Sequence, residues 1–364
     1  MKNEVSQTKY SKVIEYLKEE ILMGRIKQGE QIPSENTLAE MLSMSRNTVR
    51  KALSVLVNEG YLYTEHGRGT FCRDRSKIRK SSRNIGVITT YISEYIFPRV
   101  IQGVDSILSE KGYSIILKNT DNDVLKEAAY LEEALEKDLE GLIIESTKSA
   151  LFSNNIKYYD ALDNHHIPYV FIHGCYQQLE GKPQIILDDI EGMYLIVKYL
   201  ADIGHRNIAG IFKADDIQGV NRHKGYVKAL SEYGIPYNPD YVVWFHTEDR
   251  LSKPYAAIKA MIDSGIKIDA VSCYNDQIAF KMYELFNEMG KRVPEDISIT
   301  GFDDSYLSVN CPVKLTTVSH PKEKLGEIAA QVLLNMIKDC SYLNKPVKKI
   351  IKPELVVRDS CINR

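Results

Sequence analysis

The spacing of apolar residues changes once along this chain of 364 residues, close to residue 80. Between Ser45 and Glu59 they recur at i, i+3, i+4, i+7 and i+8, which is the buried stripe of an amphipathic helix. After Asn84 they come in short continuous runs such as "IGVITT", "GLIIEST" and "ISITGF", which is typical of strands covered on both faces. The pattern predicts a small helical segment followed by a large α/β region.

The helical segment has the features of a helix-turn-helix. Ser45 is a good N-cap for the amphipathic helix, and "SMS" makes a tight turn before it. An earlier short helix begins at Ser34 and Glu35 and directs Leu38, Ala39 and Leu42 inward. The next stretch, "GYLYTEHGRGTFC", predicts two short strands around a glycine-rich turn, a wing whose backbone can approach a groove.

The exposed first turn of the second helix carries side chains suited to DNA. An Arg can make two hydrogen bonds to guanine and an Asn two to adenine, and Ser or Thr can reach phosphate. The alternative, an ordinary basic surface helix, leaves the turn and the wing unexplained. The residues that this pattern predicts to contact DNA are Ser45, Arg46, Asn47, Thr48 and Arg50 on the helix and its cap, and His66, Gly67 and Arg68 on the wing.

The stretch "IPSENTLAEMLSMSRNTVRKALSVLVNEGYLYTEHGRGTF" resembles the winged helix-turn-helix domain of GntR-type bacterial transcription factors. The resemblance implies that the turn from Arg46 to Arg50 enters the major groove. It also implies that Ser34 and Glu35 lie near the DNA backbone and that the wing tip, residues 66–68, reaches the minor groove.

After Asn84 the apolar runs alternate with helical segments, for example Val124 to Lys137 and Asp276 to Met289. Such alternation indicates βαβ units and parallel sheets. About 280 residues are many for one sheet, so we predict two doubly wound parallel-sheet lobes. Polar residues follow many of the strands, where ligands of such sheets bind, although each can equally cap the next helix.

These patterns divide the chain into a winged helix-turn-helix domain (1–72), a basic linker (73–83, "RDRSKIRKSSR") and an α/β domain (84–364). Up to Arg83 there are 16 Lys and Arg against 10 Asp and Glu, whereas the remainder has 31 against 39. A basic head on an acidic body indicates that only the head meets a polyanion.

Composition narrows the class of protein. A chain that is 44% hydrophobic and 26% charged is typical of soluble globular proteins. The six cysteines are scattered without a CxxC pair, the N-terminus is charged throughout, and no run of about 18 apolar residues is present. We expect free thiols in the cytoplasm, and no membrane partner.

The usual signatures of an enzyme are missing from the α/β region. No GxGxxG follows a strand, and no Walker loop, GxSxG or HExxH occurs. We therefore expect no catalytic site, no metal site and no cofactor.

Five blocks of the α/β region resemble the effector domain of the lactose/galactose repressor family, which is similar to periplasmic sugar-binding proteins. They are, in order, "YLADIGHRNI", "NRHKGY", "CYNDQIAFKMYE", "VPEDISITGFDD" and "LTTVSHPKEKLG". That family usually carries a different, smaller DNA-binding head, so its hinge-helix contacts to DNA are not expected here.

The resemblance implies a sugar site between two lobes. Sugar hydroxyls need paired donors and acceptors, and a missing partner costs roughly 1–3 kcal/mol. Tyr95 or Phe97 is expected to pack on the C–H face of the sugar. The residues implied to bind sugar are Tyr91, Tyr95, Phe97, Glu145, Lys148, His173, Arg222, Asp276 and His320.

Plainer roles remain open for some of these residues. Arg222 and Asp276 can form a structural ion pair with each other. His173 can be an ordinary core histidine, and Trp244, the one tryptophan, fits a core as well as a pocket.

The combination of this head with this body is similar to that of the arabinose-responsive repressors of Gram-positive bacteria, on stretches such as "NIGVITTYISEYIFP", "GIFKADDIQGV" and "CYNDQIA". It implies a homodimer that binds palindromic operator DNA and is released by L-arabinose. The alternatives are a related monosaccharide as effector, an activator, a sugar-transport binding protein or a sugar-modifying enzyme. A transport protein would need an export signal and no basic head.

Overall fold

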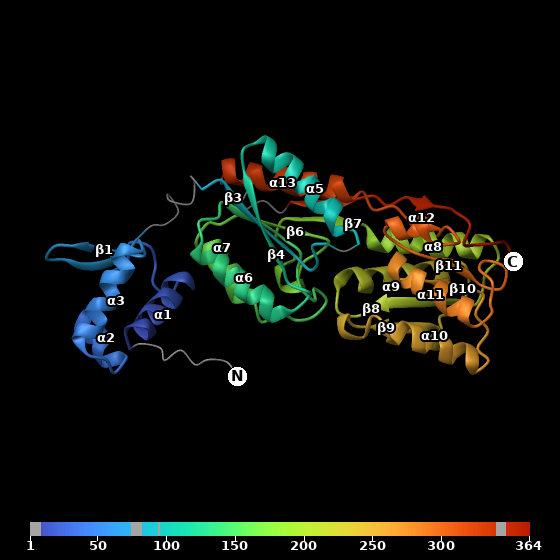
Figure 1. Ribbon diagram of the computed structural model, residues 1–364, viewed down its shortest axis with the longest axis horizontal. Helices are drawn as coiled ribbons and strands as arrows, with labels where there is room; N and C mark the ends of the chain where they lie inside the picture. Colours follow the sequence, from blue (N-terminus) through green and yellow to red (C-terminus); the bar gives the residue numbers. More distant parts are fainter. Residues whose placement is uncertain (1–8, 74–81, 94, 340–346) are drawn as a thin grey trace. The chain divides into compact units, whose positions relative to one another are not determined.

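The computed structural model describes residues 9–73, 82–93, 95–339 and 347–364 (Figure 1). The chain forms two compact units. The first runs from the N-terminal segment to Gly86 and includes 128–142 and 154–168, and the second comprises 87–127, 143–153 and 169–364. Residues 74–81 of the predicted linker lie outside the described residues, so the domain limits at 72 and 84 stay predictions.

The N-terminal part of the first unit is a winged helix-turn-helix. Helices α1 (Lys9–Leu22), α2 (Glu35–Met41) and α3 (Arg46–Asn58) precede the antiparallel strands β1 (Leu62–Glu65) and β2 (Gly69–Cys72). Apolar side chains from all three helices are fully buried, which explains why the helices keep one arrangement. They include Val13, Leu17, Leu38, Val49, Ala52 and Leu56.

The predicted caps and turn of this domain are confirmed. The Ser45 hydroxyl accepts a hydrogen bond from the Thr48 amide at 3.2 Å and begins α3. Ser34 caps α2 in the same way through the Thr37 amide. At the tip of the wing Gly67 has φ of 73°, a left-handed conformation that glycine adopts without strain.

A six-stranded sheet has the order β13-β7-β6-β5-β3-β4. Its helices include α5 (Phe97–Glu110), α6 (Val124–Glu136), α7 (Ile156–Asn164) and α13 (Lys322–Lys338). The strands are β3 (Asn84–Thr89), β4 (Ser114–Asn119), β5 (Gly141–Ile144), β6 (Tyr169–Ile172), β7 (Gln184–Leu187) and β13 (Lys348–Ile351).

A second sheet, of four strands, has the order β11-β10-β8-β9 and is parallel throughout. The helices around it are α8 (Asp189–Asp202), α9 (Ile217–Glu232), α10 (Lys253–Asp263), α11 (Asp276–Glu288) and α12 (Tyr306–Asn310). Its strands are β8 (Ile208–Lys213), β9 (Val242–Phe245), β10 (Ala270–Ser272) and β11 (Ser298–Thr300). The two predicted doubly wound lobes are therefore present.

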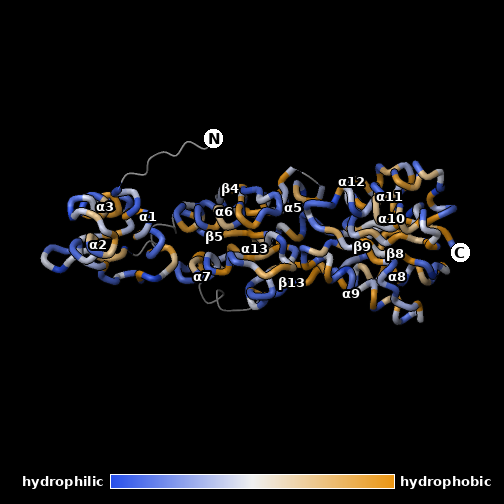
Figure 2. Tube along the Cα trace, turned by 90° about the horizontal axis from the view of Figure 1, so that it is seen from below, coloured by the Kyte–Doolittle hydropathy of each residue, from blue (hydrophilic) through white to orange (hydrophobic). Residues whose placement is uncertain are grey.

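Hydrophobic segments coincide with the strands and with the faces of the helices beside them (Figure 2). Strands β5 and β6 are buried at every position, which accounts for their continuous apolar sequence. Helices α5 and α13 pack closely because Gly103 and Gly326 carry no side chain at the contact. A Cβ at Gly103 would lie 2.1 Å from the Glu323 carbonyl oxygen.

The chain passes three times between the two sheets of the second unit. It crosses after β7 at Asp188, after β12 (Thr317–Val318) near His320, and before β14 (Leu355–Val356). Strands β12 and β14 pair antiparallel, and the Ser319 amide donates to the Glu354 carbonyl. The three crossings thus form one hydrogen-bonded hinge.

Candidate functional site

The first turn of α3 presents polar side chains to solvent. Arg46, Asn47 and Arg50 are exposed, whereas Val49 between them is fully buried. Nε and Nη2 of Arg50 donate to the carboxylate of Glu35 at 3.2 and 2.9 Å. This hydrogen-bonded pair lowers the pKa of Glu35 and fixes the direction of the guanidinium.

The tip of the wing carries further basic side chains. His66 and Arg68 are exposed at its tip, and Arg68 pairs with Glu65 at 2.6 Å. The hydroxyls of Ser34 and Ser45 each cap a helix. Their predicted contact with DNA would therefore be an additional role. The structure thus brings the predicted residues onto the recognition helix, its cap, the start of α2 and the wing.

The second unit contains a cavity at the carboxyl ends of four strands, β3, β5, β8 and β10. In both sheets the strand order reverses between these neighbours, and ligands of open α/β sheets bind at such switch points. The cavity has a volume of about 100 Å³. Its polar lining is Thr90, Tyr91, Tyr95, Asn122, Glu145, Ser146, Lys213, Asp216, Gln218, Arg222, Arg250, Tyr274, Asn275, Gln277 and Asp303.

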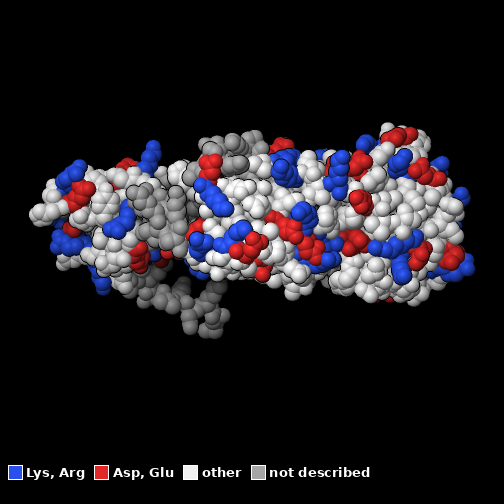
Figure 3. Space-filling view, turned by 90° about the horizontal axis from the view of Figure 1, so that it is seen from above, with Lys and Arg blue, Asp and Glu red and all other residues white. Residues whose placement is uncertain are grey.

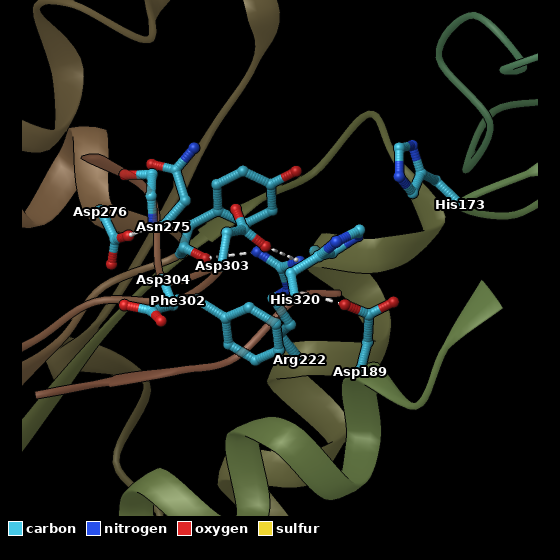
Figure 4. Close-up of polar contacts among 12 residues, drawn as sticks. His173, Asp189, Arg222, Asn275, Asp276, Phe302, Asp303, Asp304 and His320 are labelled. Carbon is cyan, nitrogen blue, oxygen red and sulfur yellow. Dashed lines mark hydrogen bonds and ion pairs between the residues drawn. The ribbon is translucent and has the colours of Figure 1, made fainter. Parts of the chain in front are cut away.

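Arg222, at the base of the cavity, is only 1% exposed. Its Nε donates to Asp189 at 2.8 Å, and its Nη2 lies 3.2 Å from Asp303 (Figure 4). The guanidinium also stacks 3.6 Å from the ring centroid of Phe302. Burial alone would lower the pKa of Arg222, but the carboxylates of Asp303 and Asp189 raise it, so the residue stays charged.

Lys213 and Asp216 form a second charged group on the wall. The Lys213 ammonium lies 3.1 Å from Asp216 and 3.4 Å from Asp215. Burial lowers its pKa, but the two carboxylates outweigh burial and raise it. The Tyr274 hydroxyl donates to Asp216 at 2.6 Å.

Glu145 is the matching acidic group at the end of β5. Its carboxylate accepts from the Thr90 amide at 2.9 Å and from His173 Nδ1 at 2.9 Å. Burial raises its pKa, but His173 and Thr90 lower it below the usual value, so Glu145 is ionised. Beside it, the Ser146 hydroxyl is buried with no hydrogen-bond partner among the described residues.

Five of the nine residues implied to bind sugar line this cavity: Tyr91, Tyr95, Phe97, Glu145 and Arg222. The Tyr95 hydroxyl lies 2.8 Å from Asp303 Oδ2 and so reaches from the loop after β3 to the loop after β11. Phe97 lies edge-on to His173, with ring centroids 6.0 Å apart.

The other four lie outside the described lining. Lys148 forms an ion pair with Glu248. The rings of His173 and His320 are buried 5.2 Å apart, behind Glu145 and at the hinge. The Asp276 carboxylate accepts from Thr317 Oγ1 and the Ser305 amide, at 2.7 Å each.

The possible ion pair of Arg222 with Asp276 is absent from the described structure, because Arg222 pairs with Asp189 and Asp303 instead. The alternative of a plain core role fits Trp244, which packs on Phe212 and His223.

Sequence reasoning missed several lining residues as site residues, namely Asn122, Lys213, Asp216, Arg250, Asn275 and Gln277. Two of them had a usable signal, since Asp216 and Asn275 each lie three residues beyond the end of an apolar strand, β8 and β10. Both also cap helices, through the amides of Gly219 and Ile278.

Comparison with known proteins gives a consistent picture. Residues 9–72 match the bacterial regulatory proteins of the gntR family, and residues 197–361 match a periplasmic binding protein-like domain. The chain is 43% identical to an arabinose metabolism transcriptional repressor of Halalkalibacterium halodurans, over 97% of this chain and 96% of that protein. It is 42% identical to a protein of the same name in Geobacillus stearothermophilus, over 94% of this chain and 96% of the relative.

This chain belongs to the family of arabinose metabolism transcriptional repressors. A solved LacI family transcriptional regulator from Enterococcus faecium with bound ribose is also similar, with a TM-score of 0.66 and 26% identity over 77% of this chain and 99% of that one. The predictions of fold class and of a repressor rather than an enzyme are confirmed by these relatives.

Two further observations accompany this membership of the repressor family. Within the described ranges, no helix is long and apolar enough to cross a membrane. In the same residues, no group of three His, Cys, Asp or Glu side chains is placed to hold a metal ion.

The raised pKa of Asp276 predicts that the stability of the fold depends on pH. Burial raises its pKa to about 7, against the opposing hydrogen bond from Ser305. Because this folded-state pKa exceeds the unfolded value, the native protein binds an extra proton between about pH 4 and 7, and stability falls as pH rises through 7. We expect wild type to lose about 1–3 kcal/mol relative to Asp276→Asn between pH 5 and 8, measured by urea unfolding. Equal pH profiles for the two proteins would contradict the raised pKa.

Proposed function

We propose that this protein is a cytoplasmic repressor that binds operator DNA and is released when L-arabinose occupies the cavity lined by Arg222, Lys213 and Glu145. The observation that carries the proposal is the lining itself, in which buried charged groups of both signs surround a small space. Cations donate to sugar hydroxyls and carboxylates accept from them, so a neutral polyol can use both.

The size of the cavity supports a monosaccharide. About 100 Å³ corresponds to roughly seven to ten water-sized positions at ~10–15 Å³ each. A pentose has ten non-hydrogen atoms, so it would fill the space, whereas a disaccharide would not fit without further opening. The names of the two close relatives favour arabinose among the pentoses.

We assign sugar contacts to the lining residues, with Tyr91, Tyr95, Glu145 and Arg222 from the sequence prediction and Phe97 as the apolar wall. Lys213, Asp216, Asn275 and Asp303 join them because they face the same space. We assign Lys148, His173, Asp276 and His320 supporting roles around this set.

We assign DNA recognition to α3 and the wing. In a winged helix-turn-helix the recognition helix enters the major groove, and two-fold symmetric dimers read palindromic sites. The protein would therefore act as a homodimer in which each head reads one half-site. On the face seen in Figure 3, Lys and Arg are interspersed with Asp and Glu. Charges of both signs on this face limit its attraction for DNA.

The test is a titration of L-arabinose into a complex of the protein with labelled operator DNA. We expect sugar to lower operator affinity by about 5–150-fold, the range of a coupling of ~1–3 kcal/mol. Undiminished affinity at saturating L-arabinose would rule out a sugar-released repressor, and increased affinity would indicate a co-repressor.

Lys213→Met should weaken L-arabinose binding by about tenfold, because it removes a buried hydrogen-bond donor and leaves Asp216 without its cation, with only the neutral donors Gly219 N–H and Tyr274 O–H. Calorimetric titration measures the effect. Lys198→Met is the matched control, since this exposed lysine of α8 lines neither the cavity nor the hinge. Equal losses in both variants would remove Lys213 from the site.

A further inference from the structure

A second cavity lies in the same unit, beyond the Arg222–Asp189 ion pair, and measures about 630 Å³. It is bounded by the loop after β6, by strands β7 and β13, and by the first turns of α8 and α9. Its polar lining includes His173, Gln177, Asp189, Asn221, Lys224 and Lys348.

Two buried pairs join this cavity to the first one. Arg222 lines the first cavity, and its partner Asp189, at 2.8 Å, lines the second. Glu145 lines the first cavity, and its partner His173, at 2.9 Å, lines the second. Figure 4 shows the arrangement, with His173 and Asp189 on one side of Arg222 and Asn275 on the other. A group that binds in the second cavity therefore touches the residues that orient the first.

His173 has one ring nitrogen without a hydrogen-bond partner among the described residues. Its side chain is 3% exposed, and its Nδ1 is committed to Glu145. Its Nε2 is buried and has no hydrogen-bond partner among the described residues. A buried polar atom without a partner costs roughly 1–3 kcal/mol, so a ligand hydroxyl that reached this nitrogen from the second cavity would recover that cost.

The charges around the cavity indicate a neutral ligand. Lys224 and Lys348 oppose Glu180 and Asp188 at the rim, and Asp189 is already paired with Arg222. Neither an anion nor a cation finds a matching excess of charge. The amides of Gln177 and Asn221 offer both donors and acceptors, which suits hydroxyl groups.

We propose that this second cavity binds a neutral polyhydroxylated compound, a second sugar molecule, beside the buried pairs that order the first site. The inference rests on the proposed function of the first cavity, because the linking pairs matter only if sugar binds there. Binding at the second cavity is weaker than at the first, since the space is several times larger and encloses a sugar less completely.

Equilibrium dialysis with radiolabelled L-arabinose tests the proposal by counting sugars per chain. We expect wild type to bind one sugar tightly and a second at least tenfold more weakly. Val220→Trp should keep the tight sugar and weaken or abolish binding of the weak one, because Val220 lines only the second cavity and a tryptophan there would project into it and occupy part of the space. Ser231→Trp, an exposed position of the same helix, is the matched control and should keep both.

The first cavity provides the reciprocal arm. Lys213→Met should weaken the tight sugar about tenfold and leave the weak sugar bound, which separates the two sites. Saturation of wild type at one sugar, or a weak sugar that binds folded Val220→Trp with unchanged affinity, would overturn the second site and leave the proposed function standing. Absence of any tight sugar in wild type would instead overturn the proposed function.

Discussion

Arg222→Met protein is expected to hold its operator in the presence of L-arabinose at concentrations that release wild type. The substitution removes the guanidinium that spans Asp189 at the start of α8, Asp303 after β11 and the Tyr274 carbonyl after β10. Loss of a hydrogen bond from a charged donor to a sugar hydroxyl costs about 1.5–3 kcal/mol, which corresponds to roughly 10- to 150-fold in sugar affinity. Calorimetry with L-arabinose and operator titration measure the two effects.

The same change also strains the fold, so a second variant is needed. Two buried carboxylates without their cation destabilise a protein by about 3–5 kcal/mol unless they take up protons. Arg222→Lys keeps a positive charge, but one ammonium cannot reproduce the planar fork that reaches Asp189 and Asp303 together. We expect it to fold, to bind operator and to respond weakly to sugar. Arg292→Met, an exposed arginine paired with Asp296, is the control. Normal sugar affinity in folded Arg222→Lys would show that the fork is not used.

The partners of Arg222 also mark where sequence reasoning stops. The motif "NRHKGY" predicted Arg222 as a site residue, and Arg222 lines the cavity because a helix after a strand brings its first turns to the sheet edge. Its partners are 33 and 81 residues away in sequence, on loops that only the folded sheet brings together. Asp276 was also predicted to bind sugar, but its side chain points toward Ser305 and Thr317. No periodicity in the sequence encodes this side-chain direction.

The helix caps explain the residues that were missed. Asp216 and Asn275 follow buried strands, where a polar residue has two ordinary explanations, a cap or a ligand. In the structure one side chain both caps a helix and lines the cavity. Oδ1 of Asp216 accepts from the Gly219 amide, while its Oδ2 accepts from the Tyr274 hydroxyl at the cavity wall. Because capping and ligand binding were treated as alternatives, some residues that line the cavity were not predicted as site residues.

The fold was more predictable than the site, with one instructive exception. Continuous apolar runs identify β5 and β6 because both faces of these strands are covered. Strand β13, with the sequence KKII, was not predicted, because it is exposed at three of four positions. It forms because parallel pairing with β7 satisfies its backbone, a long-range contact that local composition does not reveal.

Arg50→Ala is expected to reduce operator affinity by about 1–3 kcal/mol and to leave binding to unrelated DNA within a few-fold of wild type. Arg50 is exposed on the first turn of α3, and Nε and Nη2 of its guanidinium donate to the Glu35 carboxylate. A side chain held in this way loses little entropy when it contacts a base, which is why its removal should affect specific binding above all. Fluorescence anisotropy with operator and scrambled DNA measures the difference.

Arg25→Ala is the control that separates loss of base recognition from loss of one positive charge. Arg25 is also half-exposed and paired with acidic neighbours, Glu19 and Glu20, but it follows α1 and lies outside the recognition helix. Its loss should weaken both DNAs about equally. Glu35→Gln adds a graded arm, because it frees Arg50 without removing it, and we expect a smaller loss of about 0.5–1 kcal/mol for operator alone. If Arg50→Ala weakened operator and scrambled DNA to the same extent, Arg50 would be a phosphate contact, and the assignment of base reading to this turn of α3 would be wrong.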